Sequence, residues 1–321
     1  MKNKILITSP DACRHFFRNV RPYNSSEKPQ IWDIKSICPT LSDADLAIKL
    51  SEFFNTISNE FSPLVPTDIP VSFPRDLPVL RPYQVSERIP RIKKPRSKIR
   101  GDIFPNLMTE FSDLLAQPLC DIYNTITETL IWPTVWKVEI VTVIPKCAAP
   151  EEFDQLRNIS CTLLVSKIYE SYLLSWIREE VTVRHNQYGG VRGCSTQHHL
   201  LHTWETILED LEDSRSATVL TSIDFSKGFN RVSHQHCLKA FAAHGASTPV
   251  LALLATFLQD RTMTVRINKD FSPPLPVNGG CPLGSLLGVY LFNVSIDDIE
   301  QSPAAILEET TENDIRVGDF F

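Results

Sequence analysis

The chain is organised around the sequence Thr218-Val219-Leu220-Thr221-Ser222-Ile223-Asp224-Phe225-Ser226-Lys227-Gly228-Phe229-Asn230. Its first half is rich in β-branched and apolar residues, which predicts a strand, and Asp224 stands at the end of that strand. The residues that follow are typical of a turn. A carboxylate beside a backbone carbonyl at a strand end is a natural ligand for a hard divalent cation, but it is equally an ordinary way to end a strand and cap the next element. These thirteen residues alone leave both interpretations open.

The composition is that of an ordinary globular protein. Apolar residues make up 42% and charged residues 22% of the 321 residues, which is enough for one large domain or two smaller ones. The net charge of −6 argues against a surface covered in positive charge, although it is compatible with a local basic channel. The eight cysteines form no CxxC pair, which predicts reduced thiols in an intracellular protein, cytoplasmic or nuclear. We expect neither a signal peptide nor a membrane span, because the longest apolar stretch covers just residues 250–258.

Hydrophobic periodicity predicts helices along most of the chain. A capping box at Ser42-Asp43-Ala44-Asp45 marks the start of the first one. The expected helices cover 42–57, 105–131, 162–181, 195–213, 233–244, 249–259 and a last stretch from about 286. In the 195–213 helix we expect one side to face the core, and that side consists of Leu200, Leu201, Trp204, Leu208 and Leu211. The proline-rich residues 62–90 predict an extended connector.

Other strands are expected at two places. Residues 136–146 form an apolar β-rich run that ends in Lys146. Residues 262–267 alternate as a strand, can turn at 268–270, and can pair back through 273–278. A tight glycine-containing loop follows at 279–285.

A basic segment lies at residues 88–100 and contains no acidic residue. Its cations are Arg88, Arg91, Lys93, Lys94, Arg96, Lys98 and Arg100. It is either a solvated linker or nuclear-import signal, or an arm that binds the phosphates of nucleic acid by releasing counterions.

Nine short motifs occur in order along the chain. They are Pro133-x-x-Trp136-Lys137, Ile144-Pro145-Lys146, Arg157-Asn158-Ile159-Ser160, Lys167-x-Tyr169-Glu170, Gln187-Tyr188-Gly189, Gly193-Cys194-Ser195-Thr196, Asp224 to Asn230, Gly280-Cys281-Pro282-Leu283-Gly284-Ser285 and Leu291-Phe292. In this order they resemble the reverse transcriptase domain of LINE-type (non-LTR) retrotransposons. The resemblance covers roughly residues 40–300.

The resemblance implies RNA-directed DNA polymerase activity by a two-metal mechanism. Asp224 matches the first metal-binding aspartate, Asp319 matches what remains of the second motif, and both would hold Mg²⁺. The carbonyl of Phe225 would be a further ligand. The implied partners are an RNA template, a DNA primer and deoxynucleoside triphosphates (dNTPs).

The same resemblance implies a nucleotide site. Lys146 and Arg157 match basic residues that meet the triphosphate. Phe229 matches the aromatic residue that closes off the sugar 2′ position, although a core aromatic is an equal alternative. The Gly284-Ser285 loop would pass close to the template and the incoming base.

The fold implied is α/β (α+β), with polymerase fingers and a palm in which an antiparallel sheet packs on helices. Residues 1–100 would form an N-terminal helical and extended segment with the basic linker, 101–215 a fingers-like part, and 216–321 a partial palm. Strands 218–225 and 315–320 would form the palm sheet, with the 262–278 hairpin attached. We expect the thumb to be missing.

Departures from the family pattern weigh against full activity. Phe320 stands where the second aspartate of the pair is expected, and the chain then ends, which we interpret as truncation. Leu283 replaces a glutamine, and Asn230 replaces an aspartate. Three hypotheses remain: a weakly active or inactive copy, a non-catalytic module that binds nucleic acid through the basic segment and the fingers surface, or an active enzyme completed by further sequence.

Two other clusters of polar residues are weaker candidates. His198, His199 and His202 share a helix but lack the HExxH arrangement of a zinc site. Asp297-Asp298 matches a helix end in relatives, so we do not take it as the aspartate pair.

Overall fold

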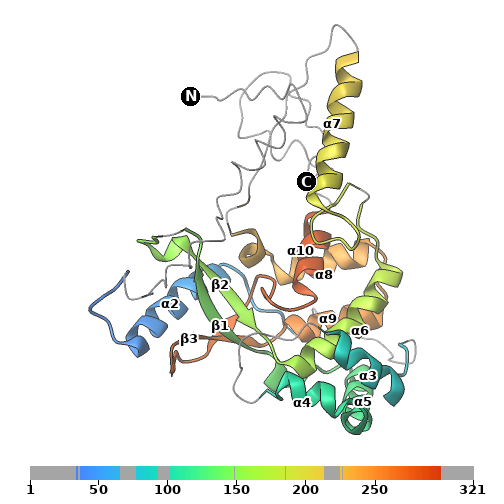
Figure 1. Cartoon of the computed structure of the whole chain (residues 1–321), viewed down its shortest axis with the longest axis horizontal. Coiled ribbons are helices and arrows are strands. Elements are labelled where there is room, and N and C mark those ends of the chain that lie inside the picture. Colours follow the sequence, from blue (N-terminus) through green and yellow to red (C-terminus); the bar gives the residue numbers. More distant parts are fainter. Residues whose placement is uncertain are drawn as a thin grey trace.

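A computed structural model describes residues 34, 37–65, 77–92, 102–147, 149–184, 186–212, 225 and 227–297. The expected strand at 315–320 and, apart from Phe225, the expected strand at 218–225 lie outside these residues. The described chain is a mixed α/β structure in which a sheet and a group of helices each have a hydrophobic core (Figure 1).

The described sheet combines strands that are far apart in the sequence. Its strands are β1 (Val138–Pro145), β2 (Leu156–Cys161), β3 (Arg261–Ile267), β4 (Asp270–Phe271) and β5 (Leu275–Val277). Their order is β2-β1-β3-β4, and β5 also pairs with β3. β1 and β3 run parallel, whereas the other pairs are antiparallel. The sheet is therefore mixed rather than purely antiparallel.

The predicted hairpin at 262–278 is present as β3, β4 and β5. β3 pairs with β1, in a register that places Val141 opposite Val265. Both valines are almost fully buried, so this pairing lies inside the core. The structure thus joins strand β1, which lies in the part that we expect to be fingers-like, to this hairpin.

Helix α2 (Asp43–Ser58) covers one face of the sheet (Figure 1). Its apolar side, with Leu46 and Leu50, packs against Val141, Met263 and other residues of β1 and β3. The Ser42 hydroxyl caps the helix by accepting a hydrogen bond from the Asp45 backbone N–H at 3.1 Å. The capping box therefore predicted this helix correctly.

The second core is formed by helices on the other side of the molecule (Figure 1). Its elements include α3 (Pro82–Arg88), α4 (Pro105–Glu110), α5 (Ser112–Thr129), α6 (Leu164–Glu180) and α9 (Thr248–Leu258). Buried aromatic rings fill its centre: the rings of Trp132 and Tyr169 lie 5.0 Å apart, and those of Tyr123 and Tyr169 lie 5.4 Å apart. The periodicity at 162–181 and 249–259 thus predicted α6 and α9 correctly.

Two predictions in this helical region were wrong in detail. The extended connector at 62–90 contains α3, because Pro82 occupies the first turn, where a proline needs no backbone hydrogen bond. The single helix at 105–131 is interrupted at Phe111, which leaves helical geometry with φ −104° and ψ 27°.

Helices α8 (His234–Ala243) and α10 (Gly288–Ile296) pack against each other and carry the loop at 279–285 between them and the sheet (Figure 1). Asp297, just after α10, is buried and lies 2.9 Å from Nε2 of His244. It also accepts a hydrogen bond from the backbone N–H of Arg184 at 3.1 Å. Asp297 therefore lies at the end of α10, as expected, and joins it to His244 and Arg184.

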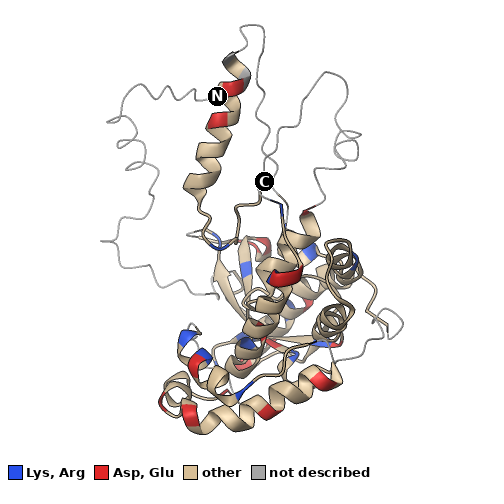
Figure 2. Cartoon of the chain, turned by 90° about the vertical axis from the view of Figure 1, so that its right-hand side faces the viewer, with Lys and Arg blue, Asp and Glu red and all other residues tan. Residues whose placement is uncertain are grey.

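Helix α7 (Thr196–Glu212) stands away from the rest of the described chain (Figures 1 and 2). The side that we expected to face the core is exposed, with exposed fractions between 44% and 67% at Leu200, Leu201, Trp204, Leu208 and Leu211. That prediction was wrong for the structure described, because helical spacing gathers apolar residues on one face but does not say which element covers them. None of the described elements packs extensively against this face.

Among the described residues, no helix combines the length and the apolar character that a membrane span needs. The cysteines in this part of the chain are thiols rather than disulfides.

Candidate functional site

A cleft of about 720 Å³ opens between α2, the beginning of β2 and the short helix η7 (Gly228–Arg231). Phe53, Phe54 and Ile57 of α2 give it an apolar wall. The rest of the wall mixes polar and apolar side chains, and it comes from the ends of β1 and β2 with the turn between them, from the motif that follows Asp224 and from Leu283.

Two of the predicted phosphate-binding residues meet at the sheet edge of this cleft. Antiparallel pairing places Ile144 opposite Arg157, so Lys146, two residues beyond Ile144, lies beside the start of β2. Arg157 is exposed, and Lys146 donates a hydrogen bond from Nζ to the carbonyl oxygen of Asp154 at 2.7 Å. The pairing of β1 and β2 therefore brings together two cations that are eleven residues apart in the sequence.

A third cation, Lys227, lines the same cleft and was missed by the sequence reasoning. Its ammonium group lies 2.6 Å from Oδ1 of Asp154 and 4.9 Å from the centre of the Phe53 ring. The hydrogen bond and the charge of Lys227, with a smaller contribution from Lys146, lower the pKa of the Asp154 carboxyl. Lys227 has a positive φ of 57°, which is unusual for a residue with a side chain, and directly precedes the first residue of η7.

The two aromatic residues of the motif, Phe225 and Phe229, both line the cleft but differ in burial and packing. Phe229 is partly buried, and its ring stacks on Phe292 with centres 4.3 Å apart. Phe225 is 38% exposed. Gly228 lies between them, where an added Cβ would be 3.2 Å from both Phe225 and Phe292. The position of Phe229 fits the core alternative as well as the sugar-facing one, since its ring stacks on Phe292 and the residue also lines the cleft.

The loop at 279–285 reaches the cleft through Leu283 rather than through Ser285. The Ser285 side chain is buried and donates a hydrogen bond to Oε2 of Glu170 at 2.7 Å, and the backbone N–H of Leu286 donates to the same oxygen at 2.7 Å. Gly284 lies against β2, where an added Cβ would be 1.9 Å from the carbonyl oxygen of Ser160. The structure thus places Gly284 and Ser285 behind the cleft wall, as supports of the loop.

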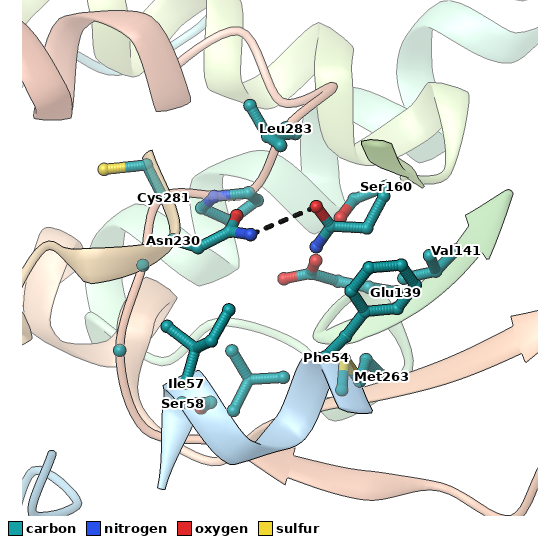
Figure 3. A pocket seen from close by; sticks show the side chains of 15 residues that line it. Phe54, Ile57, Ser58, Glu139, Val141, Ser160, Asn230, Met263, Cys281 and Leu283 are labelled. Carbon is teal, nitrogen blue, oxygen red and sulfur yellow. Dashed lines mark hydrogen bonds between the residues drawn. The ribbon is translucent and has the colours of Figure 1, made fainter. Parts of the chain in front are cut away.

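A small cavity with polar and apolar side chains adjoins the cleft and shares Phe54, Ile57, Asn158, Asn230 and Leu283 with it (Figure 3). The amide of Asn230 donates a hydrogen bond to Oδ1 of Asn158 at 3.1 Å. Figure 3 shows that the buried carboxylate of Glu139 also points into this cavity. Asn230, which stands where the family pattern carries an aspartate, therefore joins η7 to β2.

The predicted metal ligands Asp224 and Asp319 lie outside the described residues. Within the described ranges, no three His, Cys, Asp or Glu side chains come together as a metal site, and this includes His198, His199 and His202. The described residues do not by themselves fit the two-carboxylate Mg²⁺ site that the resemblance implies.

Most of the basic segment also lies outside the described residues: Lys93, Lys94, Arg96, Lys98 and Arg100. Arg91 is described, and it forms an exposed ion pair with Glu87 at 3.4 Å. In the view of Figure 2, the Lys and Arg residues and the Asp and Glu residues of the described chain are interspersed.

Comparison with known proteins supports the resemblance. Residues 144–312 match the family described as reverse transcriptase (RNA-dependent DNA polymerase). A probable RNA-directed DNA polymerase from transposon BS of Drosophila melanogaster is 29% identical over 187 residues, which is 56% of this chain and 20% of that relative. The RNA-directed DNA polymerase from mobile element jockey of Drosophila melanogaster is 28% identical over 215 residues, 64% of this chain and 23% of that relative.

A third relative, the probable RNA-directed DNA polymerase from transposon X-element of Drosophila melanogaster, is 27% identical over 190 residues, 58% of this chain and 21% of the relative. The chain thus spans about a fifth of the length of these curated relatives. The family match covers more than half of the chain and contains Lys146, strand β2 with Arg157, the η7 motif and the 279–285 loop. The chain therefore belongs to the reverse transcriptase family, as a reverse transcriptase domain of the LINE-type (non-LTR) retrotransposon kind.

Proposed function

We propose that the cleft binds the triphosphate of a dNTP, and that the chain is the nucleotide-binding part of an RNA-directed DNA polymerase domain. One observation carries this proposal. Lys146 and Arg157, from two strands, and Phe225 and Phe229, from the motif after Asp224, all line one cleft. The resemblance assigns Lys146 and Arg157 to the triphosphate, Phe229 to the sugar and the carbonyl of Phe225 to the metal, and the shared cleft is consistent with one nucleotide site.

The side chains suit an anionic ligand with a planar or sugar-like part. Arg157 can form two parallel hydrogen bonds to phosphate oxygens, which makes it the stronger phosphate contact of the two predicted cations. Lys146 presents a point charge beside it. Phe229 is held by its stack on Phe292, so its ring has a fixed position from which to limit the space around a sugar.

Polymerases of this family generally depend on divalent metal ions, which activate the attacking hydroxyl and neutralise the triphosphate. We assign Asp224 and Asp319 to Mg²⁺ in this chain by resemblance alone. Asp224 directly precedes Phe225, a residue of the cleft wall, which supports the assignment of the first ligand.

We further propose that DNA synthesis by this chain is weak or absent. Phe320 replaces the second aspartate of the pair, and Leu283 replaces an amide side chain with an apolar one on the cleft wall. Mg²⁺ requires near-ideal octahedral ligation by oxygen, which one missing carboxylate compromises. Nucleotide binding through Lys146 and Arg157 does not depend on that carboxylate.

Binding of a fluorescent dNTP tests the first proposal. We expect Arg157→Met to weaken binding by at least about tenfold, since it removes a charge-assisted contact. Lys269→Met is the matched control, because Lys269 is an exposed cation in the turn between β3 and β4 and outside the cleft. Equal affinities for the two variants would contradict the proposal.

Primer extension on an RNA template with Mg²⁺ and dNTPs tests the second proposal. If the natural chain incorporates nucleotides and the Asp224→Ala variant does not, the enzyme is active. That result would overturn the proposal that DNA synthesis is weak or absent. A salt-dependent shift of RNA mobility, lost when the cations of 93–100 become alanine, would support the alternative of a non-catalytic nucleic-acid-binding role. Absence of any RNA shift at low salt would exclude that alternative.

A further inference from the structure

We propose that Lys227 is a third phosphate-binding cation of the cleft, and that Asp154 holds Lys227 until an anionic ligand takes its place. The inference rests on the proposed nucleotide site and adds to it a residue and a competition. It starts from the ion pair of 2.6 Å between the Lys227 ammonium and the Asp154 carboxylate.

The charges around the cleft favour an anionic ligand. Among the described residues, three cations line it, Lys146, Arg157 and Lys227, against one carboxylate, that of Asp154. Asp154 contacts two of these cations, since its carbonyl oxygen accepts from Lys146 while its carboxylate accepts from Lys227. Asp154 is thus an acceptor within the protein for two basic side chains. A ligand with several negative charges would bind these side chains more strongly than one carboxylate does.

Lys227 is positioned for this exchange. Its backbone adopts a φ of 57°, a conformation that costs free energy for a residue with a side chain, and its carbonyl accepts the Asn230 N–H at 2.8 Å. Its ammonium also lies over the ring of Phe53 at 4.9 Å. The backbone and the aromatic wall can therefore keep the ammonium at the cleft after it leaves Asp154.

Asp154 is suited to release the ammonium. It lies in the short helix η6 (Phe153–Gln155), and its side chain is 59% exposed, whereas that of Lys227 is 22% exposed. Ion pairs with one partner in water are weak, and a bound triphosphate offers several acceptor oxygens in place of one carboxylate. The alternative is that the pair only fastens η6 to η7, in which case its loss would change stability and leave anion affinity unchanged.

Binding of inorganic tripolyphosphate and of a dNTP to the full chain, measured by calorimetry, distinguishes these possibilities. We expect Asp154→Asn to tighten binding by about three- to tenfold and Lys227→Met to weaken it by about tenfold. The key variant is the double one, in which Asp154→Asn should have no effect once Lys227 is methionine. Glu60→Gln is the control, because it removes the same charge and weakens an exposed ion pair to Arg231 of η7, with 3.5 Å between the charged atoms, yet Glu60 does not line the cleft.

The outcomes separate this inference from the function on which it rests. Binding that depends on Arg157 but not on Asp154 or Lys227 would overturn the inference and leave the nucleotide site standing. Binding seen in Asp154→Asn but not in the natural chain would support the inference directly. No binding in either protein would overturn both. Asp154→Ser, measured alongside with a thermal melt, checks that a gain in affinity comes from the lost charge and not from altered folding.

Discussion

At the scale of single residues, Gly284 shows how the 279–285 loop depends on one backbone position. Its φ is 151°, and an added Cβ would lie 1.9 Å from the carbonyl oxygen of Ser160. We expect Gly284→Ala to lower the free energy of unfolding by at least about 2 kcal/mol, because both the conformation and the space exclude a side chain. Urea denaturation measures this. Gly189→Ala is the control, since nothing lies within 4 Å of a Cβ there, and an equal loss in both variants would contradict the argument.

His234 sets a pH dependence of stability through burial. Its Nε2 lies 2.9 Å from the carbonyl oxygen of Gly280, which fixes the neutral Nε2–H tautomer as the donor. Burial lowers the pKa of His234 from 6.5 to about 4, although the hydrogen bond to Gly280 opposes the shift. The unfolded chain therefore binds more protons than the folded one between these two pH values, and stability falls as the pH falls through that window.

We expect His234 to contribute a loss of about 3 kcal/mol in the free energy of unfolding between pH 7 and pH 4, at about 1.4 kcal/mol for each unit of pKa difference. Urea denaturation at several pH values should give a flatter profile for His234→Gln than for the natural chain. His198→Gln replaces an exposed histidine and should leave the slope unchanged. A slope that survives in His234→Gln would assign the pH dependence to other groups.

At the scale of elements, Glu170 connects α6 to the loop that lines the cleft. It is fully buried, and its carboxylate accepts hydrogen bonds from Ser285, from the N–H of Leu286 and from Ser166. We expect Glu170→Ala to cost about 3 kcal/mol of unfolding free energy, because it leaves buried donors without an acceptor. Glu179→Ala, at an exposed position of the same helix, should cost less than about 0.5 kcal/mol. Similar costs for the two variants would rule out this role of Glu170.

The elements also show what the sequence could and could not predict. The cap at Ser42 and the periodicity of 162–181 predicted α2 and α6 because both signals are local. The partner of the 262–278 hairpin could not be found in this way, since the pairing of β3 with β1 joins residues more than a hundred positions apart. The exposure of the apolar face of α7 could not be predicted for the same reason, because it depends on which distant residues pack against that face.

In the candidate site too, some residues were predicted from the sequence and others became apparent only from contacts in the structure. Lys146, Arg157, Phe225 and Phe229 were predicted by resemblance, and the structure brings all four to one cleft. Lys227 stood in the quoted motif but had no predicted role, because its significance comes from Asp154, seventy-three residues earlier in the sequence. Ser285, which we predicted close to the template and the incoming base, donates a hydrogen bond to Glu170, a residue that the motifs contained without a role.

At the scale of the whole molecule, one buried ion pair lies where the sheet meets the helical core. Arg261 of β3 donates from Nε to the carboxylate of Glu139 in β1 at 2.8 Å, and from another nitrogen to the carbonyl oxygen of Phe257 in α9 at 3.1 Å. Both charged side chains are almost completely buried. The pair therefore links the two parallel strands to a helix of the second core.

Removing one partner leaves the other charge buried without compensation, which is far more costly than losing a pair at the surface. We expect Glu139→Ala to lower the unfolding free energy by about 3–5 kcal/mol, and the apolar double variant Glu139→Leu/Arg261→Met to recover most of that loss. Urea denaturation of the singles and the double measures both effects. Glu87→Ala breaks the exposed pair with Arg91 and should lower the free energy of unfolding by about 0.5 kcal/mol or less. Comparing the two losses shows how much burial increases the cost of breaking an ion pair. A Glu139→Ala variant as stable as Glu87→Ala would show that the link between strands and helices does not depend on this pair.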